Sequence, residues 1–292
     1  MKELIKYYYN IEVELISQKK DTYIIKSDTG IYVFKDVFRD KGEMEYIYSK
    51  CLENNVRMHE IIKNVDNLYW TKYKDKEYVL LKINDVKKII EDTELENKII
   101  YIEKVVVNKQ IEKKIDLYQR QIHELGIDDV ELSTIANYFI GLAETSATIY
   151  NEVLDTSEIL STIQRYRIYY PNFAINYYDP TNFIVDCRVR DMAEYYKFKQ
   201  WNDKTNIEDI LKNIEKKNFS IEEIKIFLAR IIYPTVFFDY FEENILTKKD
   251  IGKLNYILLK TKEYNNFLYE LMEELGKRYG IKKISWIKKE LV

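Results

Sequence analysis

The first part of the chain alternates apolar and polar positions in short runs, a pattern typical of β-strands. Turns are predicted at Asp28-Thr29-Gly30 and at Asp75-Lys76. Over residues 41–54, apolar positions recur at helical spacing, which predicts one amphipathic helix. Five runs rich in β-branched and aromatic residues are predicted as short antiparallel strands: 11–16, 22–27, 31–35, 67–74 and 77–83.

Beyond residue 85 the apolar positions follow long helical patterns, with hardly any strand signal. Pro234 is expected to separate the two helices around it. The change of pattern predicts an α+β region at 1–84 and a mainly helical region at 85–292. Helices are predicted at 94–125, 130–154, 190–201, 207–217, 221–232 and 235–246, with two more before the end.

Composition indicates a globular protein, because 46% of the 292 residues are hydrophobic and can bury a sizeable core. The net charge is −3 and basic residues are spread among the acids, so no nucleic-acid-binding face is expected. The sequence contains no run of about 18 uncharged apolar residues, so no transmembrane segment is predicted. The first residues, MKELIKYYYNIEVE, carry acids where a secretory signal would need an apolar run. We therefore expect synthesis in the cytoplasm.

Cysteine and tyrosine usage narrows the chemistry only slightly. Cys51 and Cys187 have no CxxC partner and no nearby histidine, so buried free thiols are predicted rather than a metal site or a disulfide. Tyrosine occurs 27 times. This enrichment fits either an AT-rich genome or oxidative cross-linking of exposed tyrosines in a protein shell, and composition does not separate the two.

Several segments of the second region resemble one known family. They are YFIGLAETSATIY at 138–150, YYDPTNFIVDCRVRDMAEYYK at 177–197, ARIIYPTVFFDYFEE at 229–243 and the terminal ISWIKKEL. In this order they resemble the YutH/CotS group of spore coat proteins of endospore-forming bacteria, which are similar to aminoglycoside phosphotransferases. The resemblance implies a two-lobed, protein-kinase-like α+β fold, with an antiparallel-sheet lobe and one helix at 1–84 and a helical lobe at 85–292. It also implies location in the spore coat and other coat proteins as partners.

The resemblance implies a nucleotide site in the first lobe, where a strand lysine holds phosphates and a helix glutamate holds the lysine. Lys35 closes the strand IYVFK and suits the first role, although it also fits a solvated strand end. Glu45 is preferred over Glu43 as its partner, because Glu43 lies close to the helix start. The turn SQKKD carries no glycine for close phosphate approach, which weakens the prediction of ATP binding.

Catalysis in this fold needs an aspartate, usually in a His-x-Asp sequence, to orient the substrate hydroxyl. The two histidines, His59 and His123, lie at the wrong places in the chain order. Arg165-Tyr166-Arg167 stands where the motif is expected, and a guanidinium remains protonated at neutral pH. The sequence therefore leans against an enzyme.

Asp179 corresponds best to the magnesium-holding acid of the fold, although Asp179-Pro180 also fits an ordinary turn. One carboxylate without an asparagine partner would bind magnesium weakly. Asp186, Arg190 and Asp191 are predicted to have a structural role, with Asp191 also suited to capping a helix. A cleft able to bind an anion is the alternative for four arginines: Arg165, Arg167, Arg188 and Arg190.

Three functions follow from these observations. The first is a structural or assembly protein of the spore coat with a degenerate kinase-like fold and no required cofactor. The second is an ATP-dependent phosphotransferase that acts on a small hydroxylated molecule, with a base supplied by Asp179 or Asp186. The third retains ATP or ADP, with magnesium, as a ligand bound through Lys35 and Asp179 without chemistry.

Overall fold

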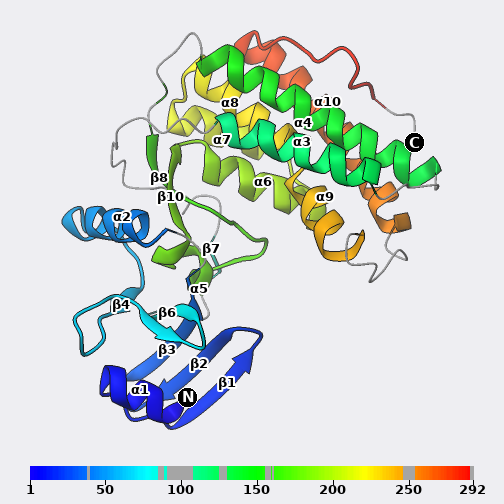
Figure 1. The fold of residues 1–292 in the computed structure, drawn as a ribbon. Helices are drawn as coiled ribbons and strands as arrows, with labels where there is room; N and C mark the ends of the chain where they lie inside the picture. Colours follow the sequence, from blue (N-terminus) through cyan, green and yellow to red (C-terminus); the bar gives the residue numbers. More distant parts are fainter. Residues whose placement is uncertain are drawn as a thin grey trace. The chain divides into compact units, whose positions relative to one another are not determined.

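The computed structural model describes residues 1–37, 40–84, 89–90, 108–124, 130–154, 159, 161–245 and 254–289 (Figure 1). The chain forms two compact units. The first unit comprises Met1–Ile102 and Thr162–Val185, and the second comprises Glu103–Ser161 and Asp186–Val292. The predicted lobes at 1–84 and 85–292 stay a prediction.

A six-stranded sheet forms the body of the first unit, with strand order β1-β2-β3-β6-β4 and with β5 paired to β6. The predicted hairpins are confirmed, but the first strand begins at Leu15 rather than at residue 11, and the strand predicted at 67–74 begins at Thr71. Helix α1 (Lys2–Tyr9) and the short strand β4 were not predicted. The strands are β1 (Leu15–Lys19), β2 (Thr22–Ser27), β3 (Gly30–Asp36), β4 (Glu60–Ile62), β5 (Thr71–Tyr73) and β6 (Lys76–Ile83).

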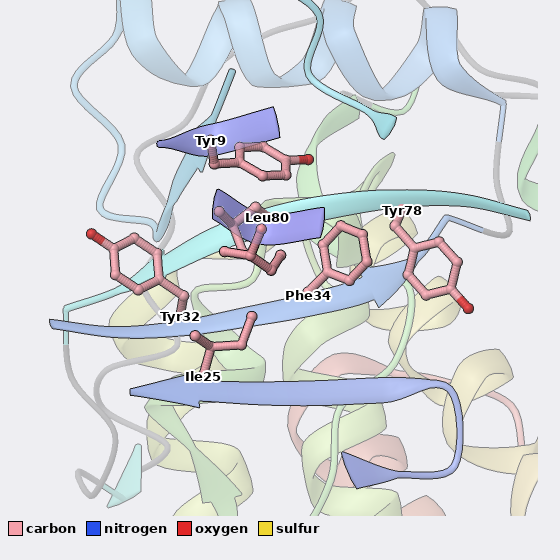
Figure 2. Close-up of a cluster of buried hydrophobic side chains, with 7 residues drawn as sticks. Tyr9, Ile25, Tyr32, Phe34, Tyr78 and Leu80 are labelled. Atoms are coloured by element: carbon pink, nitrogen blue, oxygen red, sulfur yellow. The ribbon is translucent and has the colours of Figure 1, made fainter. Parts of the chain in front are cut away.

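The two faces of this sheet pack against different helices. On one face, side chains of α1 join an aromatic core in which the Phe34 and Tyr78 rings stack with centroids 4.7 Å apart (Figure 2). On the other face, Met44 and Tyr48 of helix α2 (Lys41–Glu53) pack with Val33 and neighbouring strand residues. Successive side chains of a strand point to opposite faces, so Lys35 lies on the same face as Val33.

Short strands continue the first unit beyond residue 85, where hardly any strand was predicted. β7 (Ile89–Ile90) pairs with β9 (Asn172–Phe173), and β8 (Ser161–Arg165) pairs with β10 (Phe183–Cys187). Strand β8 shows no alternation, because all five of its residues are buried, including serine, threonine, glutamine and arginine. The prediction was wrong here because four of the five buried residues are polar, so neither an alternating nor a continuous apolar run marks the strand. The short helix α5 (Ala174–Tyr177) and a 3₁₀ turn, η2 (Pro180–Asn182), precede β10.

The second unit is helical in the part that the structure describes (Figure 1). The helices predicted at 130–154, 207–217 and 221–232 are confirmed, whereas the predicted start at 94 lies outside the described residues. The helix predicted at 235–246 ends at Tyr240 and continues as a π-helical turn, Phe241–Ile245. In the described part of the C-terminal region, one helix of 26 residues replaces the two predicted, because no proline interrupts it. The helices are α3 (Asn108–Glu124), α4 (Val130–Leu154), α6 (Arg190–Asn202), α7 (Ile207–Lys217), α8 (Ile221–Ile232), α9 (Thr235–Tyr240) and α10 (Leu254–Tyr279).

Candidate functional site

Lys35 and Asp179 form an ion pair within the first unit. Lys35 lies near the end of β3, and its Nζ donates to Asp179 Oδ2 over 2.7 Å. Their side chains are 21% and 9% exposed, so water screens the pair only weakly. Burial lowers the pKa of Lys35, but the charge of Asp179 and its hydrogen bond outweigh burial and raise the pKa overall. The fold thus brings together two of the three predicted nucleotide-binding residues.

The turn that holds Asp179 is ordered by the same carboxylate. Asp179 caps η2, and its Oδ1 accepts hydrogen bonds from the Thr181 backbone N–H at 2.9 Å and from Thr181 Oγ1 at 2.7 Å. Asp179 thus orders the turn that contains Pro180, and its magnesium-holding role stays a prediction.

The third predicted residue, Glu45, is not part of this pair. Glu45 lies half-buried on α2, and it forms no ion pair with Lys35, although both side chains are among those described. Glu43 occupies the first turn of α2, where its backbone N–H donates to the capping Asp40 side chain over 2.8 Å. The position of Glu43 agrees with the expected first-turn acid, and the nucleotide role of Glu45 stays a prediction.

Exposed apolar side chains accompany Lys35 on its face of the sheet. Directly paired residues of antiparallel strands share a face, and β2 pairs with β3 through Thr22 with Lys35 and Ile24 with Val33. Ile24 is 42% exposed, and Leu15, diagonal to it on β1, is 63% exposed. The charge of Lys35 suits a phosphate group, and the exposed apolar side chains of Ile24 and Leu15 could pack against a planar ring.

The β1–β2 turn closes without glycine. Lys20 adopts a positive φ of 54°, a conformation for which glycine is usually favoured. Asp21 in the same turn forms an ion pair with Lys76 of β6 over 2.8 Å. The turn therefore presents side chains where a glycine-rich loop would present bare amides.

Arg165 and Arg167, which are predicted to take the place of the catalytic motif, are part of the loop structure. Arg165 ends β8 and is 3% exposed, with its guanidinium 3.8 Å from the Tyr177 ring centroid and 4.9 Å from that of Phe183. Its Nε donates to the Tyr177 carbonyl over 3.2 Å. The backbone of Arg167 exchanges hydrogen bonds with the Asn182 side chain at 2.9 and 2.7 Å. The segments before and after Asp179 are thus fastened to each other.

Asp186 and Arg190 lie in a buried network of the second unit. Arg190 donates to Asp186 Oδ2 over 2.7 Å, and Arg230 of α8 donates to the same oxygen. Burial raises the pKa of Asp186, but Arg230 and Arg190 outweigh it and lower the pKa overall. Arg188 binds Glu223 rather than an open cleft. Arg188 and Arg190 thus each hold a carboxylate of the chain itself, and the predicted anion cleft stays a prediction.

Asp191 does not cap a helix, which corrects that part of the prediction. Helix α6 begins at Arg190 and its N-cap is Val189, so Asp191 occupies the first turn. The carboxylate there still suits the positive end of the helix dipole. The side chain is 1% exposed, because the start of α6 is buried in the second unit.

Sequence reasoning missed a buried ion pair on α6. Lys197 is completely buried, and its Nζ lies 3.0 Å from Glu194 Oε2 and 3.0 Å from Thr235 Oγ1. Burial lowers the pKa of Lys197 to about 8, although Glu194 raises it. The available signal was the spacing of three between a glutamate and a lysine on one helix, a pattern more typical of an exposed surface.

Metal ligands are sparse in the described residues. Among these residues, no group of three or more histidine, cysteine, aspartate or glutamate side chains is placed to hold a metal ion. Cys51 and Cys187 are both buried and free, which confirms that prediction. In the same part of the chain, every helix is too short or too polar to cross a lipid bilayer.

Comparison with protein families gives a match over residues 104–271 to the family described as "Spore coat putative kinase YutH". No curated protein matches the sequence. The resemblance recognised from sequence is thus confirmed, since the matched residues make up more than half of the chain.

Solved structures with similar folds are phosphotransferases. The aminoglycoside phosphotransferase of Alicyclobacillus acidocaldarius has a TM-score of 0.63 and 10% identity, over 91% of this chain and 93% of that one. Spectinomycin phosphotransferase APH(9)-Ia, solved with ADP and spectinomycin, has a TM-score of 0.56 and 12% identity, over 90% and 92%. Amicoumacin kinase hAmiN, solved with AMP-PNP, Ca²⁺ and Ami, has a TM-score of 0.55 and 8% identity, over 90% and 92%. The predicted kinase-like α+β fold is confirmed, and such low identities carry the fold alone.

Proposed function

Because the chain belongs to the YutH family of spore coat proteins, we propose that its kinase-like fold serves assembly of the spore coat and transfers no phosphoryl group. The protein is made in the cytoplasm of the sporulating cell and then joins the coat through contacts with other coat proteins. The fold acts as a scaffold in this role, and no cofactor is required.

The observation that carries this proposal is the arginine pair that stands in place of His-x-Asp. A general base must lose its positive charge or carry a negative one, and a guanidinium does neither at neutral pH. Arg165 is buried against Tyr177 and Phe183, and the Arg167 backbone is tied to Asn182. These contacts give the buried Arg165 side chain a structural role and tie the backbone at Arg167 to the same loop.

Neither aspartate considered as a substitute base is well suited to that task. Asp179 carries the ion pair with Lys35, and Asp186 accepts hydrogen bonds from Arg190 and Arg230. A general base needs a pKa near the working pH, whereas the two arginines lower the pKa of Asp186 below its ordinary value. The alternative function is a phosphotransferase that acts on a small hydroxylated molecule, and the assay described below tests for it.

A nucleotide held as a ligand is a second function, favoured by the Lys35–Asp179 pair. Lys35 lies opposite Thr22 beside the β1–β2 turn, and the exposed Ile24 and Leu15 share its face of the sheet. A kinase-like fold places the nucleotide phosphates at its strand lysine. Bound ADP or ATP would then stabilise the folded scaffold by mass action.

The test for phosphoryl transfer is ATP consumption by the purified protein with a panel of sugars and amino alcohols, compared with Lys35→Met. We expect the same background rate in both proteins. Turnover that depends on an acceptor and is lost in Lys35→Met would establish the enzyme. In parallel, a fluorescent fusion expressed in the sporulating cell should form a shell around the forespore, and a diffuse signal would contradict the coat assignment.

A further inference from the structure

The carboxylate of Asp179 already accepts hydrogen bonds at both oxygens. Oδ1 receives the Thr181 N–H at 2.9 Å and its hydroxyl at 2.7 Å, and Oδ2 receives Lys35 Nζ at 2.7 Å. The side chain is only 9% exposed, so little of it faces water. A divalent cation would have to share Oδ2 with the lysine ammonium, whose charge repels it.

The nearest amide side chain in the same turn is also occupied. Asn182 Oδ1 accepts from the Arg167 N–H at 2.9 Å, and Asn182 Nδ2 donates to the Arg167 carbonyl at 2.7 Å. Arg167 in addition brings a permanent positive charge to this loop. Magnesium requires an octahedral set of hard oxygen donors, usually with one or two carboxylates. The residues around Asp179 therefore fit the magnesium ion of active kinases poorly.

Lys35 remains suited to an anion. Its ammonium has three donors, and its face of the sheet continues into the exposed Ile24 and Leu15. We propose that this site takes the phosphate of a nucleoside diphosphate or triphosphate without magnesium, and that Asp179 competes with this phosphate for Lys35. The inference rests on the nucleotide-ligand function proposed above.

Nucleotide binding exchanges one hydrogen-bond partner of Lys35 for another. When the nucleotide binds, Lys35 Nζ moves its hydrogen bond from Asp179 Oδ2 to a phosphate oxygen, while Thr181 continues to satisfy Asp179 Oδ1. Breaking the pair costs free energy that is subtracted from nucleotide affinity. Removing the charge of Asp179 is therefore expected to strengthen binding, whereas a magnesium-dependent site would lose affinity on the same change.

The experiment is a calorimetric titration of the full chain with ADP, once in EDTA and once in excess magnesium. The variants are Asp179→Asn, which keeps an oxygen for Thr181, and Lys35→Met. The control is Glu77→Gln, because Glu77 forms an equally short 2.7 Å ion pair with Lys41 in the same unit. Circular dichroism and melting temperature show that each variant is folded.

We expect the wild-type protein to bind ADP in EDTA with no gain from magnesium. Asp179→Asn is expected to bind about three- to tenfold more tightly, Glu77→Gln like the wild type, and Lys35→Met not at all. Binding that requires magnesium and is lost in Asp179→Asn overturns the inference but leaves the nucleotide-ligand function intact. Absence of ADP binding in both buffers overturns both. The comparison of the two buffers needs only the wild-type protein, so it decides the question even where a variant is unfolded.

Discussion

Lys35 and Asp179 lie 144 positions apart in the sequence, and a 2.7 Å ion pair joins them in the fold. The pair connects the sheet of the first unit with the turn that precedes β10. Since both partners are largely buried, removal of either one would leave the other charge buried without its partner.

Removal of either partner should destabilise the first unit. Lys35→Met leaves a buried carboxylate without its cation, and Asp179→Ala leaves a buried ammonium, so each should lower the free energy of unfolding by about 1–3 kcal/mol. The loss of stability in the double variant should be smaller than the sum of the two single losses by about 1 kcal/mol or more. The reason is that both single variants lose the same contact. Urea unfolding followed by tyrosine fluorescence measures the cycle. Strictly additive effects would show that the two charges do not interact in solution.

Arg165 should not tolerate replacement by lysine. Its planar guanidinium lies 3.8 Å from the Tyr177 ring centroid and donates to the Tyr177 carbonyl, and an ammonium cannot reproduce both contacts. Arg165→Lys is expected to lower the free energy of unfolding by about 1–3 kcal/mol.

Arg57 provides a matched control for this substitution. Its guanidinium lies 4.6 Å from the Tyr178 ring centroid, but the side chain is exposed. Arg57→Lys should therefore change stability by less than about 0.5 kcal/mol. Equal effects of the two substitutions would mean that burial of Arg165 between aromatic rings adds nothing.

The two thiols should be unreactive in the folded protein. Burial raises the pKa of Cys51 to about 12 and that of Cys187 to about 12, so hardly any thiolate forms at neutral pH. A thiol reagent such as Ellman's reagent is expected to label neither residue in buffer and both after denaturation. Rapid labelling of the native protein, located by mass spectrometry, would show that one of the sites opens readily.

Much of this fold could be predicted because its elements carry regular periods. The hairpins show a turn signal between β-branched runs, and α7 and α8 carry clear caps, with Asn206 before one and Ser220 before the other. Strand β8 could not be found because it is buried throughout, and α1 could not be distinguished because its apolar face is covered only by the folded sheet.

The candidate site residues Lys35 and Asp179 could be proposed from the sequence only through the family resemblance. The resemblance assigns a role to Lys35 near the end of a strand and to Asp179 in a turn. Their direct contact could not be predicted, because it depends on tertiary packing between distant segments. The same holds for Arg230, which was overlooked on α8 although it binds the predicted Asp186.

Lys197 should give the stability of the protein a distinctive dependence on pH. Burial lowers its pKa to about 8 in the folded protein, whereas the ordinary value is 10.5. Between these values the unfolded chain binds more protons than the folded one, so the contribution of Lys197 to the free energy of unfolding rises with pH. The buried charge of Lys197 destabilises the folded protein most below about pH 8, and this penalty disappears as the pH rises toward 10.5.

The measurement is a series of urea unfolding curves between about pH 8 and about pH 9.5, compared between the wild type and Lys197→Met so that titration common to both proteins cancels. The free energy of unfolding should rise with pH less steeply in Lys197→Met than in the wild type, by up to about 1.4 kcal/mol per pH unit. Glu194 keeps a cation nearby in this variant, since Arg230 Nη1 lies 3.7 Å away. Lys204→Met, at an exposed position, should leave the slope unchanged. Parallel curves for the wild type and Lys197→Met would mean that Lys197 keeps its ordinary titration, and that water reaches it in the folded protein.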